Sequence, residues 1–262
     1  MKRWFCVIAL STLVGCASGP RIDTTYTSRS QDSRAQFLII HYTAGSFTGS
    51  LKWLTEGPVS SHYLVNDNPP TIYGLVDENR RAYHAGVSYW KGNTQLNASS
   101  IGIEIVNLGS KQAPNGEQWF DYPQDQIEAV VALIKKIVKE HSIKPERVLA
   151  HSDIAPQRKT DPGPRFPWKR LADEGLIQWP DGNLVAQRRP NFEAQLPDVE
   201  WFQRNLAQHG FLVPSNGELD EETRKVTAAF QMKYRPANFD GIPDAETAAL
   251  LDVLNSPNGN VK

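Results

Sequence analysis

Two neighbouring segments, DQIEAVVALIKKIVKEH at residues 125–141 and RVLAH at residues 147–151, set the architecture of this chain. Apolar residues of the first segment recur at i, i+3, i+4 and i+7, with lysines on the other face, which predicts an amphipathic helix. The second segment is a short apolar run of the β type that ends at His151. A helix followed at once by a strand is typical of a sheet that a helix covers.

Four more β-type runs lie upstream, at residues 37–41, 62–65, 71–76 and 101–106. Strands of this length need a shared sheet and a covering layer to bury their apolar side chains. The order of strands, helix and strand therefore predicts an α/β domain, in which a mixed central sheet is flanked by helices.

Beyond residue 163 the sequence becomes rich in Pro, Trp and Arg and loses its periodicity, which indicates a domain boundary between residues 163 and 197. Three helical segments follow, at residues 197–208, 221–234 and 245–254. Two of them open alike, with GELDEET and GIPDAET, in which Asp220 and Asp244 suit helix N-caps. The repeated motif predicts a small all-α domain of three helices, and modules of that size more often bind than catalyse.

The N-terminus has the features of an export signal, with Lys2-Arg3 before an apolar run at residues 4–14. As a helix this run would reach roughly 17 Å, which is too short for a hydrocarbon core of about 30 Å. The sequence Leu13-Val14-Gly15-Cys16 resembles a bacterial lipobox, in which the cysteine is lipidated and becomes the first mature residue. The alternative is an ordinary secretory signal with a chance cysteine. The residue after this cysteine is Ala17 and not Asp, which resembles the pattern that sorts lipoproteins of Gram-negative bacteria to the outer membrane.

Composition restricts both the partners and the metal ligands. The chain of 262 residues has 28 Lys and Arg against 29 Asp and Glu, a formal net charge of −1, so it offers no basic field to a nucleic acid. Its two cysteines, Cys6 and Cys16, both lie in the N-terminal region. A metal ion in the body of the protein would therefore need histidine and carboxylate ligands.

Two histidines, His41 and His151, stand where strands are expected to end. Ligands commonly bind outside the carboxyl ends of strands in α/β sheets. Asp161 follows His151 by ten residues in a Lys-Thr-Asp-Pro-Gly turn, so a set of two histidines and one carboxylate can be assembled for zinc. Spacing alone leaves Asp153 as a rival ligand, and it leaves open that both histidines are structural.

Glu104 is the second unusual carboxylate, because the isoleucines of residues 101–105 alternate and place it on the opposite face of a strongly apolar strand. It is either the partner of an arginine or a proton carrier beside a metal site. Lys159, two residues before Asp161, is either a surface lysine or directed to the same side. His141 and His209 fall near helix C-termini, where a cation is favoured, and we expect both to be structural.

Five segments resemble, in order and spacing, the zinc-dependent N-acetylmuramoyl-L-alanine amidases of the amidase-2 family: HYTA at 41–44, SHYLV at 61–65, HAG at 84–86, NASSIGIEIVN at 97–107 and HSDIAPQRKTDPG at 151–163. The resemblance covers about residues 35–168. It implies that His41, His151 and Asp161 bind zinc and that Glu104 and Lys159 are catalytic. It fixes the neighbourhood of His84 but not its role, and we expect His84 to line the substrate groove. With the resemblance, Asp153 loses its claim as a ligand.

Residues 196–254 resemble the small helical peptidoglycan-binding module that is often attached to cell-wall hydrolases. The expected organisation is a signal peptide at 1–15, a lipidated N-terminus and linker at 16–34, a zinc amidase domain at 35–180, a linker at 181–195 and a binding module at 196–256. Such a protein would face the periplasm as a monomer, anchored in the outer membrane through Cys16. Its substrates would be peptidoglycan and muropeptides, cut between N-acetylmuramic acid, or its anhydro form, and L-alanine. The alternatives are a peptidoglycan-recognition protein that does not cut and a wall-tethering protein.

Overall fold

The computed structural model describes residues 19–114 and 116–260. The expected signal peptide at 1–15 and the expected lipidation site Cys16 lie outside the described residues. Residues 19–32 contain no helix or strand and belong to a unit separate from the compact unit that begins at Ser33. Within the described ranges, no helix is both long enough and apolar enough to cross a membrane.

The compact unit is organised around a mixed five-stranded sheet with the strand order β3-β2-β4-β1-β7. Strands β2, β4, β1 and β7 run parallel, and β3 pairs antiparallel with β2 at one edge. The strands are β1 (Phe37–Tyr42), β2 (Tyr63–Val65), β3 (Ile72–Gly74), β4 (Ser100–Ile105) and β7 (Val148–Ala150). A separate hairpin pairs β5 (Ser110–Ala113) with β6 (Gly116–Trp119). This sheet confirms the α/β class expected from the sequence.

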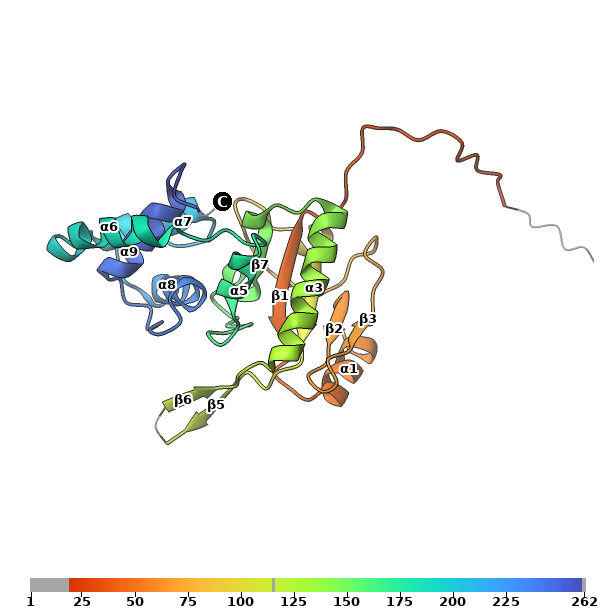
Figure 1. Ribbon diagram of the computed structural model, residues 1–262, viewed down its shortest axis with the longest axis horizontal. Coiled ribbons are helices and arrows are strands. Elements are labelled where there is room, and N and C mark those ends of the chain that lie inside the picture. Colours follow the sequence, from red (N-terminus) through yellow and green to blue (C-terminus); the bar gives the residue numbers. More distant parts are fainter. Residues whose placement is uncertain (1–18, 115, 261–262) are drawn as a thin grey trace, which may run out of the picture. The chain divides into compact units, whose positions relative to one another are not determined.

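Helix α3 (Gln124–His141) lies along one face of the sheet, across β1 in Figure 1. Its buried side chains pack in one cluster with the alternating isoleucines of β4 and with Leu38 and Ile40 of β1. Because side chains alternate along a strand, the intervening residues of β1 and β4, which include His41 and Glu104, belong to the opposite face. The period-2 pattern of the sequence therefore predicted the two faces correctly.

The remaining helices are short, except in the C-terminal region. They are α1 (Phe47–Glu56), α2 (Leu96–Ser99), α4 (His151–Ile154) and α5 (Trp168–Asp173), with a 3-10 turn at Pro145–Arg147. The C-terminal region contains α6 (Gly182–Ala194), α7 (Val199–His209), α8 (Glu221–Tyr234) and α9 (Ala245–Asn255). The segment 181–195, expected to be a linker, instead forms α6. This helix packs on α9, where Arg188 Nη1 lies 2.6 Å from Asp252 Oδ2.

The repeated sequence motif corresponds to a repeated structural device. Asp220 Oδ1 caps α8 by accepting from the Thr223 N–H at 2.7 Å, and Asp244 Oδ1 caps α9 in the same way at 2.8 Å. In each copy a buried glutamine of the preceding helix accepts from the motif glycine N–H and donates to the threonine hydroxyl. The two sets are Gln203, Gly217 and Thr223, and Gln231, Gly241 and Thr247. The duplication therefore preserves a hydrogen-bonding network as well as a sequence.

The second face of the sheet is continuous with the core of the C-terminal helices. Phe37 and Ile39 of β1 belong to one apolar cluster with buried residues of α7, α8 and α9. Trp90 packs edge-on against Phe211, with ring centroids 5.2 Å apart. His209 is buried among aromatic rings, and burial lowers its pKa to about 3. The ring is neutral at pH 7, so His209 has the structural role expected from the sequence, but as a neutral ring and not as a cation.

Candidate metal centre and active-site pocket

The parallel strands of the sheet bring the candidate residues together at their carboxyl ends. His41 lies near the end of β1, and its register partner on the neighbouring parallel strand β4 is Glu104. His151 is the first residue of α4, directly after β7, which pairs with β1 on its other side. The carboxyl ends of parallel strands meet at the same edge, so these three residues come from adjacent positions. Asp161 joins them because the Ser152 N–H donates to the Asp161 carbonyl at 3.0 Å.

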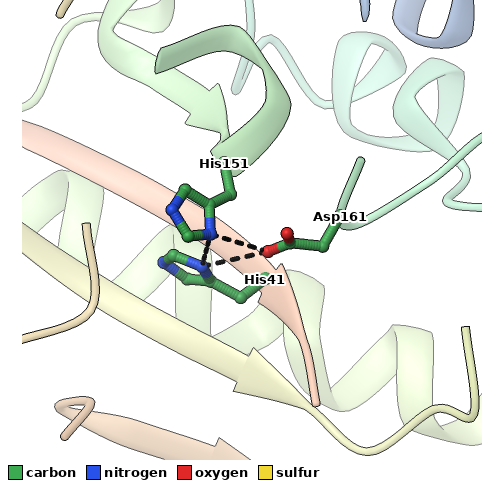
Figure 2. Close-up of side chains that lie close together, drawn as sticks. All are labelled: His41, His151 and Asp161. Atoms are coloured by element: carbon green, nitrogen blue, oxygen red, sulfur yellow. Dashed lines mark hydrogen bonds and ion pairs between the residues drawn. The ribbon is translucent and has the colours of Figure 1, made fainter. Parts of the chain in front are cut away.

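Three potential ligand atoms converge at the carboxyl ends of these strands. His41 Nδ1 lies 2.9 Å from His151 Nδ1 and 3.1 Å from Asp161 Oδ2, and His151 Nδ1 lies 3.0 Å from the same oxygen. Figure 2 shows the two rings and the carboxylate turned toward one another. All three residues are buried. They form one of two groups among the described residues whose side chains could together hold a metal ion, the other being Glu78, Glu140 and His141.

The donor set fits a zinc ion. His151 Nε2 lies 3.3 Å from the Ala85 carbonyl oxygen, which can only accept, so the ring proton resides on Nε2 and Nδ1 presents a lone pair. That lone pair faces the Asp161 carboxylate at 3.0 Å, and a cation bound between these two acceptors would remove their mutual repulsion. Zinc accepts two imidazole nitrogens and a carboxylate oxygen at roughly 2.0–2.1 Å, with a fourth position for water.

The electrostatics of the triad agree with this donor set. Burial, and to a smaller extent the neighbouring His151, lower the pKa of His41 to about 4, so the ring is neutral at pH 7. A neutral imidazole is the protonation state in which histidine binds a metal ion.

Among residues 19–114 and 116–260, Glu104 forms no ion pair that would account for its position. Its Oε2 atom is buried without a hydrogen-bond partner in the described part of the chain. Burial raises the pKa of Glu104 well above its usual value, the Asp161 charge raises it further, and Lys159 lowers it. The arginine partner that the sequence left open is thus not seen among the described residues. Glu104 is instead a carboxyl group with a high proton affinity, beside the triad.

A pocket of about 350 Å³ opens over these groups. Glu104, Lys159, His151 and Asp161 line it together, and side chains of α1 and of the loop before His84 complete the wall. Trp53 and Tyr83, which also line it, are 59% and 50% exposed and offer aromatic surface at the rim. Lys159 therefore reaches the site rather than the open surface.

His84 was assigned to substrate from the sequence, but its ring contacts other residues of the protein. Nδ1 lies 3.0 Å from His41 Nε2, and Nε2 lies 3.2 Å from Ser100 Oγ. Both ring nitrogens are engaged, although the residue lines the pocket wall. Sequence reasoning missed this contact because residue 84 lies in a loop without periodicity. The HAG motif signalled the region but not its role.

Asp153, the rival ligand, points away from the triad. Its Oδ2 accepts from the Ala150 N–H at 2.8 Å and lies 2.6 Å from Lys233 Nζ of α8. The cation comes from a residue 80 positions further along the chain, which the local sequence could not indicate. Asp153 thus has a structural partner in place of a metal.

Two stretches of the chain match known protein families. Residues 31–164 match the profile of the N-acetylmuramoyl-L-alanine amidase family, and residues 195–251 match that of a peptidoglycan binding domain. The chain therefore belongs to the N-acetylmuramoyl-L-alanine amidase family, and it is an enzyme of that class.

Two relatives extend the likeness to nearly the whole chain. N-acetylmuramoyl-L-alanine amidase AmiD of Escherichia coli strain K12 is 41% identical over 97% of this chain and 98% of its own. The solved structure of E. coli AmiD in complex with the substrate anhydro-N-acetylmuramic acid-L-Ala-D-γ-Glu-L-Lys has a TM-score of 0.81 at 40% identity, over 90% of this chain and 94% of that chain. AmpDH3 of Pseudomonas aeruginosa, in complex with anhydromuramic pentapeptide, has a TM-score of 0.82 at 38% identity, over 90% and 97%.

Proposed function

We propose that the protein is a zinc-dependent amidase that cuts between N-acetylmuramic acid, or its anhydro form, and the L-alanine of the stem peptide. The observation that carries this proposal is the convergence of His41 Nδ1, His151 Nδ1 and Asp161 Oδ2 beside Glu104, whose Oε2 has no hydrogen-bond partner among the described residues. The substrate follows from the family and from two relatives whose structures were solved with anhydromuramic peptides. A protein that only recognises peptidoglycan would need neither a complete ligand set nor a free carboxyl group.

The proposed mechanism assigns one step to each residue. His41, His151 and Asp161 would hold zinc, which as a Lewis acid polarises a carbonyl group and acidifies water. Glu104 takes the proton of the attacking water and passes it to the nitrogen of the leaving L-alanine. Lys159 places its ammonium group near the scissile carbonyl oxygen, where it stabilises the negative charge that develops there. The raised pKa of Glu104 suits a group that must both accept and return a proton.

The proposal extends to the parts of the chain outside the site. We assign residues 35–180 to catalysis and residues 196–256 to peptidoglycan binding. We propose that the protein is a monomer. Cys16 would carry the lipid anchor in the outer membrane, with the enzyme facing the periplasm. A Cys16→Ser variant should then leave the outer-membrane fraction, whereas unchanged fractionation would contradict the anchor.

Digestion of purified sacculi and of a soluble anhydromuropeptide, with and without a chelator, tests the activity. Mass analysis should show free stem peptides that begin with L-alanine, and chelation should abolish them until zinc is restored. Full turnover in a metal-free preparation would overturn the zinc assignment. Binding of sacculi without any released peptide would overturn the enzymatic one.

A further inference from the structure

We infer that the dipeptide His84-Ala85 is the element that positions both histidine ligands, by fixing which nitrogen of each ring carries the proton. His84 contacts His41 through its side chain, and Ala85 contacts His151 through its carbonyl oxygen. The inference rests on the proposed metal site. It assigns His84 a positioning role in place of the substrate contact expected from the sequence.

The proton positions follow from a chain of hydrogen bonds that ends at a backbone carbonyl. The Ser100 hydroxyl donates to the Leu96 carbonyl oxygen, which leaves its own oxygen as an acceptor for the His84 Nε2–H. No carboxylate contacts the His84 ring in the described residues, so the buried ring is neutral and its Nδ1 is an acceptor. The His41 Nε2–H must therefore donate to His84 Nδ1.

The result is a bare Nδ1 on His41, directed at His151 and Asp161. The Ala85 carbonyl oxygen gives His151 the same tautomer, because it accepts from the Nε2–H and leaves Nδ1 free. A ligand histidine whose second nitrogen is fixed by a hydrogen bond is held in ring orientation and in tautomer, and loss of such a partner typically reduces metal affinity 10–100-fold. Both ligands thus receive their orientation from adjacent residues.

The backbone around this dipeptide is fixed as well. Asn97 Oδ1 accepts from the His84 N–H at 3.0 Å and from the Ala85 N–H at 2.8 Å. Gly102 of β4 leaves the space that the His84 ring occupies, because a Cβ at residue 102 would lie 2.5 Å from His84 Cγ. The glycine within the Ile-Gly-Ile-Glu strand is thereby explained, since any side chain there would displace His84.

Direct observation of the tautomers tests the inference in the zinc-free wild-type protein. Two-bond proton–nitrogen correlation spectra of the 15N-labelled chain at neutral pH should show the Nε2–H form for His41 and for His151. An Nδ1–H form of His41 would overturn the inference. This measurement needs no variant, so it decides the matter even if substitutions at residue 84 prevent folding.

Zinc affinity, measured by competition with a chromogenic chelator, provides the second readout. His84→Phe keeps a ring but removes the acceptor, so we expect zinc affinity to fall 10–100-fold. His84→Asn keeps an acceptor oxygen near the position of Nδ1 and should recover most of the loss. His209→Phe is the matched control, because it makes the same change at another buried histidine that contacts no ligand, and its zinc affinity should stay at the wild-type level.

The outcomes separate this inference from the proposed function. Failure of the wild-type chain to bind zinc at all would reject the metal site itself. Normal zinc binding by wild type, with the same affinity in His84→Phe, would reject only the positioning role. Equal losses in His84→Phe and His84→Asn would show that ring packing, rather than the acceptor atom, matters, and would also reject the inference.

Discussion

Lys233 of α8 forms a buried ion pair with Asp153 of α4, with 2.6 Å between Nζ and Oδ2 and side-chain exposures of 5% and 1%. Asp153 follows the metal-ligand candidate His151 by two residues and also accepts from the Ala150 N–H. The Lys233 ammonium additionally lies 4.5 Å from the centroid of the Trp168 ring. The C-terminal helices therefore supply the cation that balances a buried charge directly behind the active site.

Removal of this cation should destabilise the catalytic domain itself. Lys233→Met leaves the Asp153 carboxylate buried without its counter-charge, which typically costs about 3–5 kcal/mol. The double variant Lys233→Met, Asp153→Asn should recover much of the loss, because an amide oxygen still accepts from the Ala150 N–H. Urea unfolding at pH 7 measures both. A single-variant loss below about 1 kcal/mol would show that the pair contributes little.

Glu104→Gln should separate chemistry from structure. The amide keeps the shape of the side chain but cannot take a proton, so we expect the turnover rate for an anhydromuropeptide to fall by about 10²- to 10⁴-fold. Zinc content and melting temperature should stay near wild type. Glu56→Gln makes the same change at an exposed position of α1 and should have no effect. A nearly normal rate combined with a lowered melting temperature would falsify the catalytic assignment.

Lys159 should affect the pH profile as well as the rate. Its charge lowers the pKa of Glu104, in opposition to burial and to Asp161. In Lys159→Met the Glu104 pKa rises further, so the acidic limb of kcat/KM should move to higher pH in addition to a fall in kcat. Lys159→Arg keeps a cation and should keep the limb close to its wild-type position. An unchanged acidic limb in Lys159→Met would show that Lys159 does not act on Glu104.

Acid should destabilise the fold through buried neutral histidines. Burial lowers the pKa of His209 to about 3, against about 6.5 in an unfolded chain, so the unfolded state binds more protons between these values. The contribution of His209 is fully present above pH 6.5, and about 2–3 kcal/mol of it is lost by pH 4.5. His62, whose pKa burial lowers to about 4, acts in the same direction.

Comparison of variants isolates this effect from the other histidines. In His209→Gln the difference between the free energies of unfolding at pH 7 and pH 4.5 should shrink by about 2–3 kcal/mol. The metal-ligand candidates remain in both proteins, so their own titration cancels in the comparison. The same pH dependence in the variant and in wild type would mean that His209 is not buried in its neutral form.

Strand periodicity made part of the site predictable. His41, Glu104 and His151 could be located because each lies on or directly after a strand that the apolar pattern of the sequence predicts. The choice between Asp153 and Asp161 needed the family resemblance, because spacing places both close to His151. Tertiary structure separates them: Asp153 faces Lys233 of a distant helix, whereas Asp161 reaches the two histidines.

Other features left no local signal. Helix α6 is polar, contains Pro190 in its interior and buries none of its residues fully, so no apolar stripe marks it in the sequence. Its position depends on α9, to which Arg188 is paired. The position of His84 depends on three separate segments, which meet only in the folded chain. Periodicity indicates the helix or strand to which a residue belongs. The roles of Arg188 and His84 depend on contacts between different elements, which periodicity does not indicate.

The apolar cluster shared by β1 and the C-terminal helices has a consequence for the order in which the chain can mature. The sheet residues are made first, but the apolar cluster to which Phe37 and Ile39 belong is complete only after α7, α8 and α9 have been synthesised. A polypeptide cut short before residue 199 would lack helix α8, which packs on α4, and would expose part of this cluster to water and to other unfinished chains. We therefore expect a chain truncated before these helices to aggregate and to be degraded by proteases more readily than the full-length hydrolase.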